Sequence, residues 1–314
     1  MKFFILFAHE FSAFMLLLLS PKTSLKTRNR LGYSSLLRTF LTIKSNRLKY
    51  RKLMCKEYIF LFFQLNLALA WNAQGHILVA DAALQELSAA QVAKLENYNK
   101  AFNLGYKPKS LQQAAVWLDW IHCRQIICKN FKYYHYVDYP YSDDRSRVNA
   151  PYKVNAITAV EQAMYILQNP RYSAYEKGLQ LRILMHVVAD LHQPMHTISL
   201  FNARFPHGDR GGNDYLLGNN RVGKNLHAYW DRGGGYLRKK SFKKPKAGKT
   251  LVKECEDLDP RIWARESYNI AKDFAYSIKY RHKPTKPYQR MVSKITKQRL
   301  SLASCRLGKL LKKL

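Results

Sequence analysis

Apolar positions recur every three or four residues along much of the chain, and this spacing predicts amphipathic helices. The stretches with this pattern are residues 74–95, 110–119, 154–167, 173–193 and 260–270, followed by a basic stretch that runs to the C-terminus. Capping side chains mark helix starts: Ser173 with Glu176 three positions later forms a capping box, and Asp259 precedes a proline. Ser110 is the predicted N-cap of one helix that reaches Asp119.

Strand-like alternation of apolar and polar residues is short in this chain, with residues 133–137 and 214–217 as the candidates. Residues 204–235 are rich in Gly, Asn and Asp, which predicts a long and functional loop region. Residues 238–249 carry seven basic side chains and predict a mobile, solvated insertion. We therefore expect a mostly α-helical fold: a single compact multi-helix domain with long loops and at most a short β-hairpin.

Residues 54–70 read MCKEYIFLFFQLNLALA, with a methionine, a lysine, an apolar run and Ala-Leu-Ala before Trp71. This is the pattern of a secretory signal peptide cleaved after Ala70, and it is short for a membrane span. We expect residues 1–53 to be an upstream extension and residues 71–314 to form a secreted or periplasmic domain without stable membrane association. A rival signal at residues 3–19 is interrupted by His9 and Glu10 and lacks a small-residue cleavage site.

The chain has 314 residues, of which 47% are hydrophobic, enough for one large domain. Its formal net charge is +32, and cleavage after Ala70 would remove 12 basic and 2 acidic residues, which leaves +22. Such an excess favours a polyanionic partner, either nucleic acid or an anionic membrane surface, and charge alone does not choose between them.

Four cysteines remain after the proposed cleavage: Cys123, Cys128, Cys255 and Cys305. An even number in an exported protein suggests two disulfides. We favour Cys123 with Cys128, because they are close in sequence, and Cys255 with Cys305. Free buried thiols are the alternative.

Histidine and aspartate pairs stand at helical spacing in two places. His186 and Asp190 are four residues apart, and so are His227 and Asp231, so both side chains of a pair can reach one metal ion. His196 follows Pro194 and can turn toward a second ion. One such pair alone is more often a core hydrogen bond, but a second pair at the same spacing strengthens the metal interpretation.

Three further segments complete the candidate ligands. Asp119 follows Trp117-Leu, and His135 lies in Tyr-His-Tyr-Val-Asp; each is a weak signal alone. At the proposed mature end, the α-amine of Trp71 has an ordinary pKa of about 7.7 to 8.0, so a metal displaces its proton easily. The carbonyl of Trp71 would close a chelate, and His76 would add another ligand.

These five segments, taken in their order along the chain, resemble the trinuclear-zinc single-strand-specific nucleases of fungi and plants, the mung-bean nuclease type, and their bacterial relatives. The resemblance covers nearly all of residues 71–314 and implies three zinc ions and catalytic roles for Asp119 and Asp190. It implies these ligand sets: Asp119, His135, His186 and Asp190 for one ion; His196, His227 and Asp231 for a second; and Trp71, His76 and the shared Asp190 for a third. It further implies in-line hydrolysis to 5′-phosphorylated products, with 3′-nucleotides as additional substrates.

The resemblance also implies substrate contacts. Tyr136 would stack on an unpaired base and Asp138 would bind the edge of that base, although a core tyrosine is an equal alternative. Asn213, in Gly-Gly-Asn, would orient the phosphate unless it only forms a turn. His122 stands where family members often carry Lys or Arg, so its charge would vary with pH.

Two other functions remain open at this point. A zinc phospholipase C shares this fold and much of the ligand set, but usually has Glu in place of Asp190 and Asp231. A non-enzymatic, basic nucleic-acid-binding protein with structural zinc is the other alternative; His and Asp ligands suit open catalytic sites better. We expect a monomer that acts on single-stranded nucleic acid and nucleotides.

Overall fold

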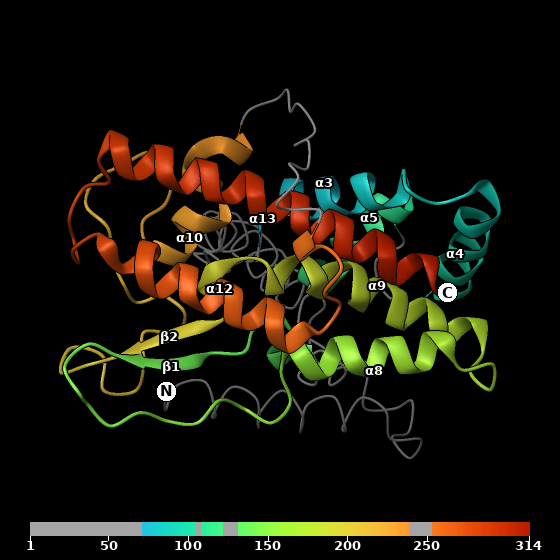
Figure 1. The fold of residues 1–314 in the computed structure, drawn as a ribbon, viewed down its shortest axis with the longest axis horizontal. Helices are drawn as coiled ribbons and strands as arrows, with labels where there is room; N and C mark the ends of the chain where they lie inside the picture. Colours follow the sequence, from blue (N-terminus) through green and yellow to red (C-terminus); the bar gives the residue numbers. More distant parts are fainter. Residues whose placement is uncertain (1–70, 104–107, 122–130, 239–252) are drawn as a thin grey trace, which may run out of the picture. The chain divides into compact units, whose positions relative to one another are not determined.

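Helices dominate the computed structural model, which describes residues 71–103, 108–121, 131–238 and 253–314 (Figure 1). The α-helices are α3 (Ala73–Leu84), α4 (Ala89–Ala101), α5 (Leu111–Ala114), α6 (Trp117–Trp120), α8 (Ala156–Gln168), α9 (Ala174–Leu191), α10 (Leu226–Asp231), α12 (Pro260–Phe274) and α13 (Lys286–Lys312). Short 3₁₀ helices are η2 (Lys132–His135), η3 (Pro194–His196), η4 (Gly233–Arg238) and η5 (Ala275–Ser277). The mostly α-helical prediction is confirmed.

Helix α9 forms the centre of the described core. It packs against α3, α4, α6, α8, α12 and α13, and Figure 1 shows α8 running alongside it. Its side chains from Leu181 to Leu191 are all buried, so this helix is enclosed on every side and not only along one stripe. His186 and Asp190 therefore lie deep inside the protein on a rigid element.

Two predicted helix starts are confirmed by their side-chain hydrogen bonds. The Glu176 N–H donates to Ser173 Oγ, and the Ser173 N–H donates to Glu176 Oε2, which forms the capping box of α9. Asp259 caps α12, where the Arg261 N–H donates to its Oδ1 at 2.8 Å and Pro260 occupies the first turn.

The predicted single helix from Ser110 to Asp119 is wrong. Ser110 caps α5, which ends at Ala114, and Asp119 lies on the separate helix α6. The carbonyl of Ala115, between the two helices, accepts a hydrogen bond from His186 Nδ1 at 2.7 Å. That carbonyl is turned toward α9, so the helix is interrupted where the candidate ligand binds.

The β structure of the described residues is limited to one short two-stranded sheet beside the helices, and its strands are parallel, so it is not a hairpin (Figure 1). Strand β1 (Tyr139–Ser142) pairs with β2 (Ile198–Phe201), with Tyr139 opposite Ile198. Helices α8 and α9 lie between the strands in the sequence, as a parallel pair requires. Both strand candidates were misplaced: residues 132–135 form η2, and residues 214–217 contribute only an isolated bridge.

The predicted loop region is shorter than expected. Residues 202–225 contain no helix and only isolated bridges, but residues 226–231 form α10 and residues 233–238 form η4. Asn225 starts α10, because its Oδ1 accepts the Ala228 N–H at 2.7 Å. Most of the predicted basic insertion, residues 239–249, lies outside the described residues.

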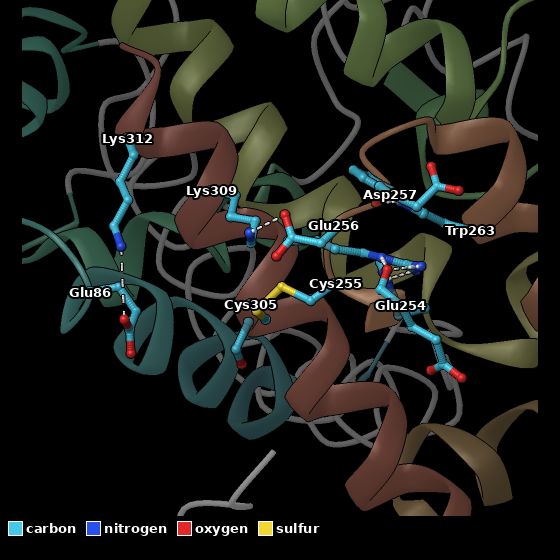
Figure 2. The surroundings of a disulfide bond; sticks show 12 residues. Glu86, Glu254, Cys255, Glu256, Asp257, Trp263, Cys305, Lys309 and Lys312 are labelled. Atoms are coloured by element: carbon cyan, nitrogen blue, oxygen red, sulfur yellow. Dashed lines mark hydrogen bonds and ion pairs between the residues drawn. A yellow bond between two sulfur atoms is a disulfide. The ribbon is translucent and has the colours of Figure 1, made fainter. Parts of the chain in front are cut away.

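One disulfide joins Cys255 to Cys305, as predicted. Figure 2 shows this bond between α13 and the segment that precedes α12, with Lys309 of α13 paired to Glu256 at 2.6 Å. Cys123 and Cys128 lie outside the described residues. Within the described ranges, every helix is too short or too polar to cross a membrane.

Candidate metal centre

Histidine and aspartate side chains from separate parts of the sequence converge on the buried end of helix α9. The eight residues and their elements are His76 (α3), Asp119 (α6), His135 (η2), His186 and Asp190 (α9), His196 (η3), and His227 and Asp231 (α10). In the described part of the chain they form three groups whose potential ligand atoms lie within 4.8 Å of one another.

The first group comprises Asp119, His135 and His186. Asp119 Oδ1 lies 3.5 Å from His186 Nε2 and 3.9 Å from His135 Nδ1. Asp190 Oδ2 lies 3.2 Å from the same two histidine nitrogens. The structure thus brings together all four residues expected to bind one ion.

The second group comprises His76, His186 and Asp190. His76 Nε2 lies 3.4 Å from Asp190 Oδ1, whereas the other oxygen of this carboxylate faces the first group. The rings of His76 and His186 are stacked, with centroids 3.9 Å apart. Asp190 therefore has one oxygen toward each group, which is the geometry of a bridging carboxylate.

The third group comprises His196, His227 and Asp231. His196 Nε2 lies 3.7 Å from Asp231 Oδ1, and His227 Nε2 lies 3.6 Å from Asp231 Oδ2. His227 and Asp231 come from successive turns of α10, as their spacing predicted.

Backbone carbonyls set the tautomers of three of these histidines. The hydrogen bonds run from His186 Nδ1 to Ala115 O (2.7 Å), from His196 Nδ1 to His135 O (2.5 Å) and from His227 Nδ1 to Gly211 O (2.7 Å). A ring that donates from Nδ1 has its lone pair on Nε2 when neutral, and this is how histidines that bind metals are usually oriented.

Several buried ligand atoms make no hydrogen bond within the described part of the chain. They are both ring nitrogens of His76, Asp119 Oδ2, Asp190 Oδ1, His196 Nε2 and His227 Nε2. Unpaired buried polar atoms are costly, and here acceptor atoms point at one another. A bound cation would satisfy them together, so the donor set fits metal ions.

Charges within the cluster shift its pKa values strongly. Burial would raise the pKa of Asp190, but His186 and His196 lower it well below its ordinary value. Burial lowers the pKa of His186, yet Asp190 and Asp119 raise it to about 9. Burial and the neighbouring His186 lower the pKa of His76. A divalent cation would compete with the protons of this cluster, so binding would release protons.

Trp71, the remaining predicted ligand, is fully buried beside these groups. The Asn72 N–H donates to the carbonyl of Asp231 at 3.1 Å, which places the adjoining Trp71 backbone beside α10. A Cβ on Gly75 would come within 2.6 Å of Trp71 Cβ, so the indole packs where only glycine leaves room. His76 directly follows Gly75 on α3.

Tyr136 directly follows His135 in the sequence, and Asp138 lies two residues further on. Tyr136 is half-buried, and the Val137 N–H donates to the carbonyl of His196 at 2.9 Å. Asp138 has a φ of 50°, a left-handed backbone conformation that residues other than glycine adopt only rarely. Burial raises the pKa of Asp138 to about 7, although His196 lies near enough to oppose the shift.

The Gly-Gly-Asn segment supports the third group from behind. Gly211 has a φ of 62°, and a Cβ there would come within 2.5 Å of the carbonyl of Met195. Its carbonyl holds His227, as described above. The Asn213 side chain donates to Arg210 O at 2.8 Å within this turn.

Sequence reasoning missed Gln193. Its side chain donates from Nε2 to Asp231 Oδ1 at 2.6 Å and accepts the Met195 N–H at 2.6 Å. Its only sequence signal is its place between two histidine motifs, beside Pro194. His122, which was predicted to approach the phosphate, lies outside the described residues.

The fold and the site together define a helical protein with three clustered His/Asp groups, each able to hold a metal ion. Residues 71–314 match the family model described as S1/P1 Nuclease. The chain therefore belongs to the S1/P1 nuclease family, and the resemblance inferred from its motifs is confirmed. Membership makes it a nuclease in class, a hydrolase that acts on nucleic acid. A comparison with curated proteins found no match.

Proposed function

We propose that this protein is a secreted, zinc-dependent endonuclease that hydrolyses single-stranded RNA or DNA to 5′-phosphorylated products and also removes the phosphate of 3′-nucleotides. The observation that carries the proposal is Asp190, which lies between two His/Asp groups with one oxygen toward each. A carboxylate in this position offsets the repulsion of two adjacent cations.

Zinc suits the donor set better than the alternatives. All eight His/Asp side chains offer imidazole nitrogen or carboxylate oxygen, which zinc accepts readily, and calcium and magnesium prefer oxygen alone. Bound zinc would lower the pKa of a water molecule from 15.7 toward about 7 and stabilise charge that develops on the phosphate.

The protein groups themselves perform two tasks in this scheme. The backbone carbonyls behind His186, His196 and His227 orient the imidazoles before substrate arrives. Asp190 and Asp119 supply negative charge that draws cations into a buried site. A zinc-based mechanism needs no separate side-chain base.

The proposed preference for single strands rests on Tyr136 and Asp138, which lie beside the metal ligands. Tyr136 is half-buried, so one base could lie on its ring while Asp138 accepts a hydrogen bond from the base edge. Such a contact needs an unpaired base, since the faces of paired bases are covered by their neighbours in a duplex. Stacking is also tolerant of sequence, which fits a nuclease without a fixed recognition site.

Export and maturation belong to the same proposal. The disulfide between Cys255 and Cys305 fits an oxidising compartment. Cleavage between Ala70 and Trp71 would free the α-amine of Trp71, which we propose as a ligand of the ion held by His76 and Asp190. The functional chain would then be residues 71–314.

The test is hydrolysis by the purified 71–314 protein of four substrates: single-stranded RNA, single-stranded DNA, duplex DNA and phosphatidylcholine. We expect rapid cleavage of one or both single strands, slow cleavage of the duplex and no release of phosphocholine. Products should carry a 5′-phosphate. Hydrolysis of phosphatidylcholine alone would establish a phospholipase, and binding of nucleic acid without hydrolysis would establish a non-enzymatic protein.

A further inference from the structure

Three tyrosine rings form a continuous row from the candidate metal centre to the protein surface. Tyr136 follows His135 directly, and its ring centroid lies 6.2 Å from that of Tyr133. Tyr133 in turn lies 4.3 Å from Tyr152, with an interplanar angle of 43°. The row therefore starts beside a candidate ligand and continues away from it.

The N-terminus of helix α8 holds both ends of this row in place. The Ala156 N–H donates to the carbonyl of Tyr136 at 3.0 Å. The side-chain amide of Asn155, the N-cap of α8, donates to the carbonyl of Tyr152 at 2.8 Å. Tyr136 and Tyr152 are not neighbours in the sequence, yet two consecutive residues at the start of α8 bind their backbone carbonyls. The spacing of the rings is thus set before any ligand arrives.

The outer part of the row is exposed and carries positive charge. Tyr152 is 57% exposed although its ring contacts that of Tyr133. The ammonium of Lys132 lies 5.5 Å from the ring centroid of Tyr133, and Lys153, next to Tyr152, is exposed. Exposed aromatic rings accompanied by cations are typical of surfaces that bind single-stranded nucleic acid.

We propose that Tyr133 and Tyr152 form a second stacking platform, which binds an unpaired base of the same strand next to the nucleotide at Tyr136. The occupant is single-stranded RNA or DNA, because the platform offers ring faces to the base and lysine charge to the backbone. This inference rests on the proposed function. A dinucleotide cleaved at the metal centre would have one base at Tyr136 and the other across the scissile bond. The platform lies on the side of Tyr136 away from that bond, so it matters only for longer substrates.

Helix α8 provides a matched control at its other end. Tyr165 is 62% exposed and its ring centroid lies 6.2 Å from that of Tyr172, so this pair resembles the platform in exposure and composition. Among the ring contacts of the described residues, neither Tyr165 nor Tyr172 touches Tyr136. Tyr165→Ala therefore removes a comparable exposed ring from the same helix without shortening the row.

The experiment measures KM and kcat for Tyr152→Ala, Tyr152→Phe and Tyr165→Ala on a dinucleotide and on a long single strand, with RNA and DNA in separate assays. Loss of one base stack should raise the KM of Tyr152→Ala on the long strand at least about fivefold. On the dinucleotide its KM and kcat should be unchanged. Tyr152→Phe keeps the ring and should behave like the unaltered protein, as should Tyr165→Ala.

Two results would overturn the inference. One is an unchanged KM of Tyr152→Ala on the long strand, and the other is an equal rise for the dinucleotide, which would indicate a general structural defect. Failure of the proposed function looks different, because the unaltered protein would then cleave neither substrate. The RNA and DNA assays show which strand the platform accepts.

Discussion

Arg306 donates a hydrogen bond from Nη1 to His192 Nε2 at 2.9 Å, and this contact connects helix α13 to the end of α9. The same guanidinium donates to the carbonyl of Glu254 at 2.9 Å, and Glu254 adjoins the disulfide cysteine Cys255. Figure 2 shows Glu254 beside this disulfide. Support for the helix that carries Asp190 therefore extends through Arg306 to the disulfide.

Arg306→Met should destabilise the protein substantially. The Arg306 side chain is fully buried and also binds both carboxylate oxygens of Glu266, so its loss leaves several polar atoms unpaired. We expect the free energy of unfolding to fall by about 3 kcal/mol. Denaturant titration measures it. The control is Lys309→Met on the same helix: its partner Glu256 is exposed, so the loss should stay below about 1 kcal/mol. Equal losses in both variants would contradict this account.

Glu266 should make stability depend on pH in the acid range. Burial would raise its pKa, but hydrogen bonds and charge from Arg306 and Arg299 lower it below its ordinary value of 4.5. A lowered pKa stabilises the folded state above the ordinary value and loses this effect as the pH falls through the folded pKa. Glu266→Gln should therefore cost about 2 to 3 kcal/mol at neutral pH, and the difference should shrink as the pH falls below 4.5. A difference that is constant with pH would rule out this ion-pair explanation.

Local signals predicted the helices well and the strands poorly. The capping box at Ser173 and the proline after Asp259 act within one turn, so they are visible in the sequence. Strand β1 instead pairs with residues 198–201, far along the chain, and no local alternation reveals that partner. The break between Ser110 and Asp119 was also hidden, because the carbonyl of Ala115 at the break is bound by His186 of another helix.

In the candidate site, too, the features set by local spacing were predicted and those set by distant contacts were not. The spacing of His186 with Asp190, and of His227 with Asp231, predicted which side chains share a helix face. His192 lies between these motifs, and both of its ring nitrogens are hydrogen-bonded, one of them to Val188 O. The carbonyls that set the tautomers carry no side-chain signal, so only the folded chain reveals them.

Gln193→Ala should weaken metal binding at the group of His196, His227 and Asp231. The Gln193 amide holds Asp231 Oδ1 at 2.6 Å, and outer-shell partners of this kind are worth about 10- to 100-fold in metal affinity. Zinc titration against a competing chelator measures the change. Gln112→Ala is the control, because that amide also donates to an aspartate, Asp81, at 3.2 Å. Unchanged zinc affinity in Gln193→Ala would show that the amide only supports the backbone.

The free amine of Trp71 should be required for full activity. One extra residue before Trp71 converts this amine into an amide nitrogen, which holds its proton tightly and binds zinc poorly. Residues 71–314 should therefore bind more zinc and cleave single strands faster than the same chain with Gly-Ser added in front. Metal analysis and a hydrolysis assay on both forms measure this. Equal zinc content and equal rates would leave Trp71 as a packing residue beside Gly75.

The central claim is that Asp190 joins two metal ions in a nuclease centre. The most direct measurement is the zinc content and single-strand hydrolysis of residues 71–314 and of Asp190→Asn, before and after chelation and zinc addition. We predict three zinc ions in the unaltered protein, activity that chelation removes and zinc restores, and fewer ions with almost no activity in Asp190→Asn. Full hydrolysis by the chelated protein, or three ions and normal rates in Asp190→Asn, would contradict it.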